Sequence, residues 1–213
     1  MLTAARIRYP GRALVLGARF APGAAGSLVA PPPAELVDRV VGLDDLWRGV
    51  QSLTDSLASA RDDAERLMRM ERAFERRMRP GIVADPAAAT LEQRPEALRI
   101  ADLAREAGVS ERQLERRFRA RLGITAAMAR RIARVLRASR MISSNPDTPW
   151  QELMHACGFY DQAHLIREFR AFAGLTPRAY ADEQRVGFIQ YRSTDPGDIR
   201  LAHANPPLQR RSA

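Results

Sequence analysis

The sequence predicts a mainly α-helical protein in which a short N-terminal segment and two helices precede a larger helical domain. Apolar residues recur at helical spacing within residues 43–79 and 87–184. Residues 108–125 (GVSERQLERRFRARLGIT) return in altered form as residues 158–177 (GFYDQAHLIREFRAFAGLTP). The stretch between the copies, residues 126–143 (AAMARRIARVLRASRMIS), has the composition of one long helix.

The N-terminal part is expected to hold one strand-like piece and two helices. Residues 1–33 are rich in Gly, Pro and Ala, and residues 13–20 (ALVLGARF) are the strand-like piece. A helix over 43–58 follows, because Asp44 and Asp45 suit its first turn. Its apolar stripe consists of Leu43, Leu46, Trp47, Val50, Leu53 and Leu57. A second helix over 62–79, capped by Asp62, is predicted to bury Leu67, Met68, Phe74 and Met78.

Proline and glycine mark the end of this N-terminal part. Pro80-Gly81 stops the second helix, and Pro86 continues the break. The predicted division is a sensor-like or dimerisation segment (1–80), a linker (81–86), a helical domain (87–184) and a tail (185–213).

The two copies in the helical domain align residue by residue. An offset of fifty pairs Leu103 with Leu153, Ala107 with Cys157, and Gly108 with Gly158. An offset of fifty-one then pairs Leu114 with Leu165, Phe118 with Phe169, Gly123 with Gly174, and Thr125 with Thr176. The offset changes after the first glycine, inside a turn. One residue added within a helix would instead rotate the apolar face by about 100°.

Each copy has the plan of a helix-turn-helix unit. A short helix (100–107 or 150–157) ends at a glycine that can adopt positive φ, and a second helix packs against it. The exposed N-terminal face of such a second helix reads bases in the major groove, where Arg suits guanine and Gln suits adenine. The candidate contacts are Arg112, Glu115, Arg116 and Arg119 in the first copy and Gln162, Ala163, His164 and Arg167 in the second. The alternative is an ordinary helical bundle with repeated hairpins.

Three further helix starts follow from local sequence. Ser110 with Gln113, and Thr148 with Gln151, fit capping boxes, the latter with Pro149 as the first helical residue. Thr176-Pro177 opens another helix in the same way.

The long helix over 126–143 spans roughly 27 Å, close to the ~34 Å between successive major grooves on one side of a duplex. Such a rod suits two reading heads on one face of DNA.

The positive charge is concentrated in one window. All 34 basic residues are Arg, and the net charge is +9. Ten Arg and a single acid, Glu115, lie between residues 112 and 140, so this window alone carries a charge of +9. A concentrated Arg block is typical of phosphate binding, although a solvated helix face is the alternative.

The sequence contains no pattern typical of catalysis, a metal or a cofactor. The three His are not at metal-ligand spacing, the single Cys157 excludes a CxxC site, and no Gly-rich phosphate loop or GxSxG occurs. No apolar run approaches the ~18–20 residues that span a bilayer. We therefore expect a soluble, cytoplasmic protein that is not an enzyme, has no signal peptide and has no contact with membranes.

Residues 99–182 resemble the DNA-binding region of the AraC/XylS family of bacterial transcription regulators. The segments that carry the resemblance are IADLAREAGVSERQLERRFRARLGIT and ACGFYDQAHLIREFRAFAGLTPRAY. It implies seven helices, with two helix-turn-helix units joined by a long helix. It also implies base contact by Arg112, Arg116, Gln162, His164 and Arg167, and phosphate contact or packing by Arg131 and Arg134. The family usually has Pro where Ala126 stands and an aromatic residue where Ala129 stands.

The N-terminal part resembles the cupin-like sensor segment of some family members. About 30 residues precede its helices, which is too few for a closed barrel, so a truncated sensor is expected. Its two helices (43–58 and 62–79) are then a homodimer interface or an interdomain brace. A hairpin that packs only on itself is the alternative.

These observations lead to three functional hypotheses. The first is a sequence-specific regulator that binds double-stranded promoter DNA and is a candidate partner of RNA polymerase. The family resemblance implies an activator more often than a repressor. The second is a low-specificity architectural DNA binder that works through its Arg block. The third is an enzyme or small-molecule-binding protein without DNA contact.

Overall fold

The computed structural model describes residues 17–18, 20–29, 31–78, 85–94 and 99–185. These residues form helices and connecting segments and include no strand. The helices are η1 (Ala25–Ser27, a 3₁₀ turn), α1 (Pro33–Leu36), α2 (Leu43–Leu46), α3 (Val50–Ala58), α4 (Asp63–Arg77), α5 (Pro86–Gln93), α6 (Ile100–Glu106), α7 (Glu111–Leu122), α8 (Ala126–Ser144), α9 (Trp150–Cys157), α10 (Gln162–Ala173) and α11 (Pro177–Arg185). The prediction of a mainly α-helical protein is confirmed.

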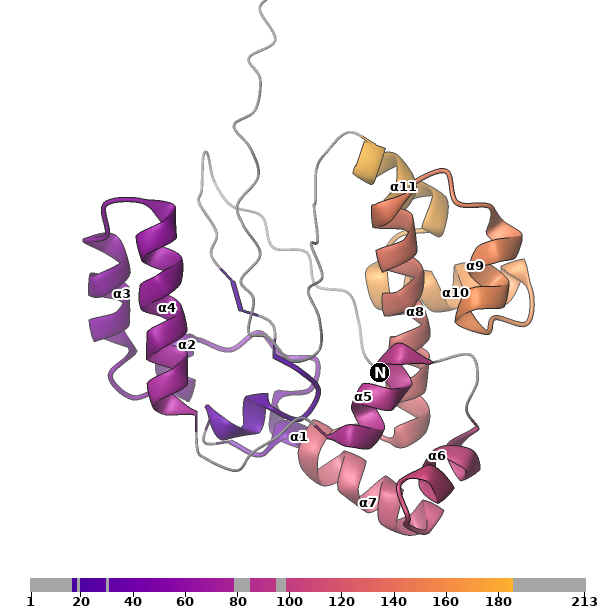
Figure 1. Ribbon diagram of the computed structural model, residues 1–213, viewed down its shortest axis with the longest axis horizontal. Coiled ribbons are helices and arrows are strands. Elements are labelled where there is room, and N and C mark those ends of the chain that lie inside the picture. The colour runs from indigo at the N-terminus through magenta and orange to yellow at the C-terminus, as the bar shows by residue number, and fades with distance from the viewer. Residues whose placement is uncertain (1–16, 19, 30, 79–84, 95–98, 186–213) are drawn as a thin grey trace, which may run out of the picture.

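Helices α3 and α4 form a hairpin that stands apart from α5–α11 (Figure 1). Asp62 caps α4 as predicted, because its side chain accepts a hydrogen bond from the Glu65 N–H. Phe74 lies at the centre of the hairpin core, with ring centroids 5.3 Å from Phe20 and 5.5 Å from Trp47. The hairpin is therefore covered on one side by the segment that precedes it.

Three predictions for the N-terminal part were wrong or lie outside the described residues. The helix predicted over 43–58 is broken into α2 and α3, because Trp47 is extended and Gly49 adopts the left-handed conformation at φ 79°. Met68 is 41% exposed, and Met70 is buried instead, since Leu67, Met70 and Phe74 share the inner face of α4. The strand-like piece 13–20 is described only at residues 17, 18 and 20, none of which is in a strand.

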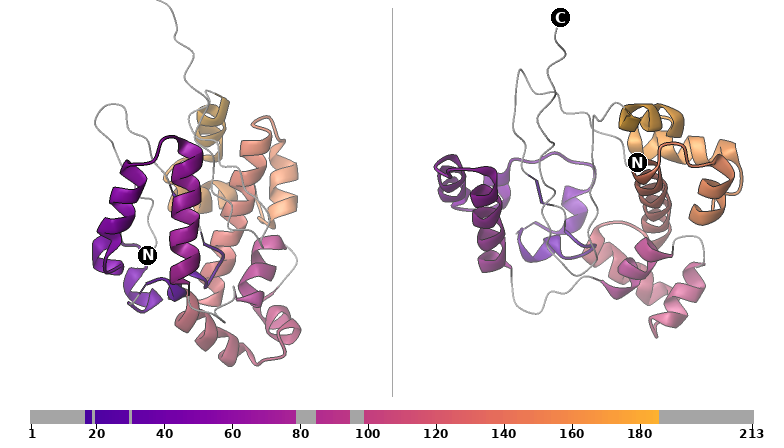
Figure 2. Two further views of the ribbon diagram at one scale, coloured as in Figure 1. Left: turned by 60° about the vertical axis from the view of Figure 1, so that its left-hand side comes forward. Right: turned by 45° about the horizontal axis from the view of Figure 1, so that its top comes forward.

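Seven helices, α5–α11, make up the C-terminal part, as the family resemblance implies. The first of them starts at Pro86, a residue that we had placed in the linker. Figures 1 and 2 show α6–α7 toward one end of α8 and α9–α10 toward the other. Helix α8 belongs to both cores, because Ala126 and Ala133 pack in the first unit and Val135, Ala138 and Ile142 in the second. The two units are therefore built on one continuous helix.

The predicted helix starts were confirmed with one exception. Ser110 and Gln113 form the capping box of α7, and Thr176 accepts from the Ala179 N–H at the start of α11. The box predicted at Thr148 was wrong. Helix α9 starts at Trp150 with Pro149 as its N-cap, because the Thr148 hydroxyl instead donates to the Asn145 carbonyl at 2.6 Å.

The N-terminal segment packs against the first helix-turn-helix unit at two points. The Asp85 N–H donates to the Pro22 carbonyl at 2.9 Å. Helix α1 contacts α7, and a Cβ at Gly123, which closes α7 at φ +74°, would lie only 2.6–2.7 Å from the backbone of Pro33 and Ala34. A glycine is therefore required there both for its backbone conformation and for the close approach of α1.

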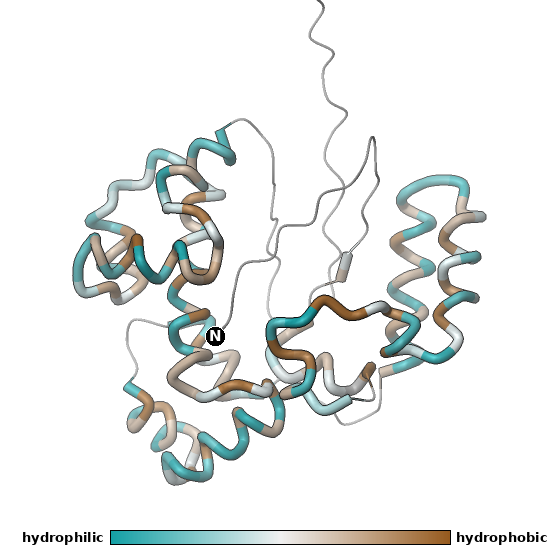
Figure 3. The backbone as a smooth tube through the Cα atoms, turned by 180° about the vertical axis from the view of Figure 1, so that it is seen from behind, coloured by the Kyte–Doolittle hydropathy of each residue, from teal (hydrophilic) through white to brown (hydrophobic). Residues whose placement is uncertain are grey.

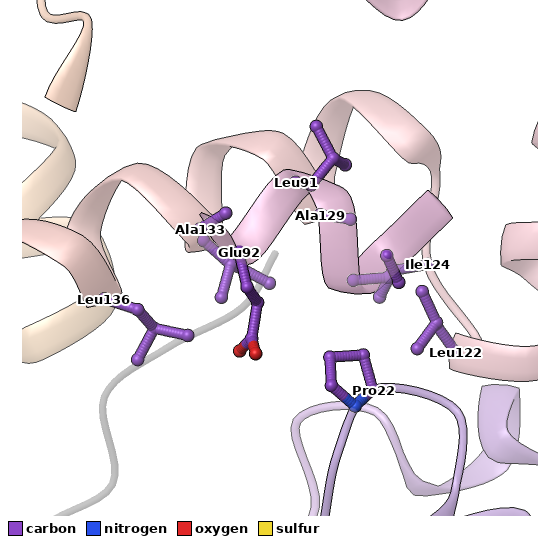
Figure 4. A pocket seen from close by; sticks show the side chains of 10 residues that line it. Pro22, Leu91, Glu92, Leu122, Ile124, Ala129, Ala133 and Leu136 are labelled. Atoms are coloured by element: carbon purple, nitrogen blue, oxygen red, sulfur yellow. The ribbon is translucent and has the colours of Figure 1, made fainter. Parts of the chain in front are cut away.

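A small cavity remains beside the first of these points. It has a volume of about 90 Å³ and is lined almost wholly by apolar residues of the N-terminal segment, α5, the α7–α8 region and α8. Figure 4 shows Pro22 facing Ile124 and Leu122, with Ala129 on the α8 side. Ala129, whose side chain is a single methyl group, is one of the residues that line this space.

Candidate nucleic-acid interface

The two glycine turns have the same geometry. Gly108 and Gly158 have φ of +66° and +69°, the left-handed conformation that both copies of the repeat predict. The apolar residues that fix the second helix of each unit, Leu114, Phe118, Leu165 and Phe169, are all 0% exposed. Cys157 is also fully buried, as expected of a small core residue at the position of Ala107. The cores thus hold α7 and α10 in equivalent places, and we name these two the recognition helices.

The face of each recognition helix opposite its core is open to solvent. Most of the predicted base contacts lie on it: Arg112, Arg116, Arg119, Gln162, Ala163 and Arg167 are exposed, and Glu115 and His164 are half-buried. Figure 3 shows that α7 is hydrophilic along most of its length. Arg116 and Arg167 match at the offset of fifty-one, so each helix presents one exposed guanidinium at the same position.

Glu115 is held by two contacts within the first unit. Its Oε1 atom accepts from Arg119 Nε at 3.0 Å, and its Oε2 atom accepts from the Ala126 N–H at 2.9 Å. A proline at position 126 would have no N–H to donate. The N–H of Ala126 therefore links the first residue of α8 to α7.

His164 helps to cap α10. Its Nδ1 atom accepts from the Tyr160 N–H at 3.3 Å, and its own N–H donates to Asp161 Oδ1 at 2.6 Å. Its ring stands edge-on to Phe159, with centroids 5.5 Å apart. The imidazole is thus oriented by the turn, with Nε2 outside these contacts.

Arg131 packs α8 against α10. Its Nε and Nη2 atoms donate to the two oxygens of Glu168 at 2.9 and 3.0 Å, and its guanidinium lies 5.1 Å from the Phe172 ring centroid. The hydrogen bonds that Arg131 donates to Glu168 raise the pKa of Arg131. Of the two roles expected for this residue, the structure shows packing.

Arg134 lies one helical turn further along α8. Its Nε atom is buried without a hydrogen-bond partner, and the same holds for Arg130. Burial lowers the pKa of both guanidinium groups. The nearby charge of Arg99 lowers the pKa of Arg130 further. The charge of Arg130 likewise lowers the pKa of Arg134, whereas the charge of Glu168 raises it. Arg130 and Arg134 therefore repel each other, and Glu168 offsets the lowered pKa of Arg134 only in part.

Asp85 was missed as an organising residue because it lay inside the predicted linker. It is 0% exposed, caps α5 by accepting from the Ala87 and Ala88 N–H groups, and pairs with Arg117 Nε at 2.6 Å and Arg121 Nη1 at 3.4 Å. The Asp-Pro pair is itself a helix-start signal. Asp85 ties α5 to the flank of α7.

The Arg block is partly neutralised by Glu115 within it and by acids from outside it. Acid partners in the described part of the chain hold Arg117 and Arg121 (Asp85), Arg119 (Glu115), Arg131 (Glu168) and Arg140 (Glu92). Arg137 donates to the Gln93 carbonyl. The remaining four, Arg112, Arg116, Arg130 and Arg134, have no recorded acid partner among these residues. The uncompensated charge is thus confined to the open face of α7 and to α8.

Comparison with known proteins agrees with this geometry. Residues 103–183 match the model of a family described as a helix-turn-helix domain. These residues therefore form a helix-turn-helix domain. The matched part of the chain is therefore a DNA-binding domain of the kind found in transcription regulators.

Two solved structures are similar to about half of this chain. A transcriptional regulator from Chromobacterium violaceum with an AraC-type DNA-binding domain is 29% identical, with 46% of this chain and 88% of that chain covered and a TM-score of 0.43. The C-terminal domain of AraT, a response regulator from Geobacillus stearothermophilus, is 22% identical, with coverages of 52% and 93% and a TM-score of 0.41. None of the curated proteins is significantly similar to the chain.

A metal centre and a membrane-spanning helix are both absent from the described residues. Within the described residues, no group of three or more His, Cys, Asp or Glu side chains is placed to hold a metal ion. No helix in the same part of the chain has the length and apolar character needed to cross a membrane.

Proposed function

We propose that the protein is a sequence-specific transcription regulator that inserts α7 and α10 into successive segments of the DNA major groove. The main support is the matched pair Arg116 and Arg167, each exposed at the same position of a recognition helix. Both helices are fixed by fully buried side chains to one rod, α8. The 19 residues of α8 span about 28 Å, close to the ~34 Å repeat of the major groove.

The base contacts are assigned to the open faces of the two helices. We propose that Arg112 and Arg116 read the first segment, together with Arg119, and that Gln162, Ala163, His164 and Arg167 read the second. Glu115 orients Arg119 and the start of α8 through the two hydrogen bonds described above. In this role it acts on DNA only through Arg119.

The phosphate contacts are assigned to α8. Arg134 and its neighbour Arg130 are half-buried and repel each other, and a phosphate oxygen that accepted from the accessible part of their guanidinium groups would offset this repulsion. Arg131 instead positions α10 through Glu168. Half or more of the hydrogen bonds to DNA normally go to the backbone, so contacts of this kind set register without reading sequence.

Selection of bound duplexes from a random pool, followed by footprinting, tests the proposed function. The selected duplex should be preferred by about 10³-fold or more over random DNA. The footprint should show two protected major-groove segments about one helical turn apart. Replacing the bases of one segment should reduce affinity without abolishing protection of the other.

The second candidate is an architectural DNA binder, which the uncompensated charge of α7 and α8 favours. It differs in its response to sequence, because phosphate contacts bind all duplexes alike. No enriched duplex at any salt concentration, together with tight and strongly salt-dependent binding, would establish this second function. The absence of binding to any duplex would reject both.

We further propose that the α3–α4 hairpin forms a homodimer interface. Met68 on α4 is 41% exposed. Leu43 on the neighbouring α2 is 46% exposed, and Val40 before it is 76% exposed. Sedimentation of the wild-type protein and of Met68→Arg should show a dimer and a monomer, respectively.

RNA polymerase is a proposed partner of the DNA-bound protein, testable by transcription from the selected duplex in vitro.

A further inference from the structure

The turn of the second unit contains one residue more than that of the first. Val109 corresponds to Phe159, and the N-cap Ser110 corresponds to the N-cap Asp161, so the added residue is Tyr160. Its side chain is 93% exposed, the highest value among the exposed large hydrophobic residues in the described part of the chain. The ring therefore contributes nothing to the core of its unit.

The backbone at Tyr160 is nevertheless held on both sides. Phe159 before it is 6% exposed, and its N–H donates to the Met154 carbonyl at 2.9 Å. Asp161 after it caps α10 through the His164 N–H. The Tyr160 N–H itself donates to His164 Nδ1 at 3.3 Å. A fixed backbone thus carries the ring at the N-terminal end of α10.

The cap of α10 is rearranged to accommodate the added residue. In the first unit, the N-cap Ser110 N–H donates to Gln113 Oε1 at 2.8 Å. In the second unit, His164 replaces Gln113 and accepts instead from Tyr160, the residue before the N-cap. Position 160 is therefore part of the hydrogen-bonded turn, although its ring has no place in the packing.

We propose that Tyr160 is a DNA-backbone contact, whose hydroxyl donates to a phosphodiester oxygen beside the groove segment that α10 reads. The proposal rests on the proposed function and adds a residue that the Arg block and the helix faces did not reveal. The N-terminal end of a recognition helix is the end that meets DNA, and a tyrosine hydroxyl is among the usual donors to phosphate. The adjacent Asp161 carboxylate is engaged by the His164 N–H.

The contact would belong to the second unit alone. The first unit has no added residue at this point of its turn, and Val109 there packs against the core. Two similar reading heads can otherwise bind DNA with similar backbone contacts. Tyr160 would therefore distinguish the two halves of the footprint and favour one orientation of the domain on DNA.

A double-mutant cycle between protein and DNA tests the proposal. Full-length wild-type protein and Tyr160→Phe are titrated against the selected duplex and against copies that carry a single methylphosphonate at each linkage around the second segment. We expect Tyr160→Phe to weaken binding by about 3- to 10-fold. One methylphosphonate should weaken the wild-type protein by a similar factor and leave the affinity of Tyr160→Phe unchanged.

Tyr180→Phe is the matched control, because it removes a hydroxyl that lies 3.1 Å from Ser143 Oγ inside the same domain. It should show no coupling to any linkage. Wild-type affinity of Tyr160→Phe, or losses that add independently at every linkage, would overturn the proposal; the exposed ring would then serve a protein partner. Failure to select any duplex would overturn the proposed function and not the role of Tyr160. In that case, equal affinity of the wild-type protein and Tyr160→Phe for a random duplex would overturn the role of Tyr160.

Discussion

Arg117 and Glu168 occupy matching positions on the two recognition helices and carry opposite charges, each paired with a partner of the other sign. Arg117 Nε lies 2.6 Å from Asp85 on the α5 cap, whereas Glu168 accepts two hydrogen bonds from Arg131 on α8. Each recognition helix is thus anchored at the same point to a helix of its own unit. The chemistry of the anchor is inverted between copies, although the apolar core is repeated.

This inversion predicts the outcome of charge reversal. Arg131→Glu leaves Glu168, whose side chain is 9% exposed, opposite a like charge, and should lower the free energy of unfolding by about 2–4 kcal/mol. The double reversal Arg131→Glu with Glu168→Arg should recover at least half of that loss. Urea unfolding followed by circular dichroism measures both. The exposed Arg178→Glu is the control for net charge, and a double variant less stable than either single one would contradict the anchor.

The variants Arg167→Ala and Arg134→Ala are predicted to weaken DNA binding in different ways. Arg167→Ala should weaken specific binding by about 1–3 kcal/mol and relax the preference at one base position. Arg134→Ala should weaken binding to all duplexes and lower the slope of log affinity against log salt by about one. Affinities for a set of single-base variants of the selected duplex, each measured at several salt concentrations, separate the two.

The stability of Arg167→Ala provides the control. Arg167 is exposed, so its truncation should leave the melting temperature unchanged. Uniform weakening by Arg167→Ala on all sequences would reassign this residue to phosphate. Unchanged DNA binding by Arg134→Ala would show that Arg134 does not contact phosphate and has only a structural role.

The repeat could be predicted from sequence because its determinants are local. Leu114 with Phe118, and Leu165 with Phe169, stand four residues apart, and the turn glycines are adjacent to the helices that they end. A pattern with the period of one helix needs no knowledge of the rest of the chain. All four apolar residues are accordingly buried.

The partners of the charged residues could not be predicted in the same way. The pair of Arg117 with Asp85 joins residues 32 apart, and that of Arg131 with Glu168 joins residues 37 apart. No helical period relates such positions, so only the packing of whole helices brings them together. The break at Gly49 was missed for another reason, since a glycine within an apolar stripe costs a helix only about 1 kcal/mol and does not by itself require a break.

Glu65 should make the stability of the α3–α4 hairpin depend on pH. The pKa of its carboxyl is lowered from 4.5 to about 2, first by the hydrogen bond from the Arg61 N–H and then by the Arg61 and Arg69 side chains. The folded state thus binds fewer protons than the unfolded state between these values. The contribution of Glu65 is present above pH 4.5 and is lost as the pH falls toward 2.

The variant Glu65→Gln isolates this contribution. The difference in free energy of unfolding between wild-type protein and Glu65→Gln should be constant from pH 7 to pH 5 and should shrink as the pH falls below 4.5. Glu75→Gln, an exposed site on the same helix, corrects for the general effect of removing a carboxylate. A difference that grew on acidification would have the wrong sign for a lowered pKa.

Ala129 is predicted to be a site where a larger side chain stabilises the protein. It lines the cavity of about 90 Å³ between α8 and Pro22, whose walls are almost wholly apolar. Ala129→Leu should fill part of this space and raise the free energy of unfolding by about 0.5–2 kcal/mol. Ala127→Leu, an exposed site two residues earlier on the same helix, has the same change in helix propensity without the filling and should leave stability nearly unchanged. Equal effects at both positions would show that helix propensity, and not the cavity, is responsible.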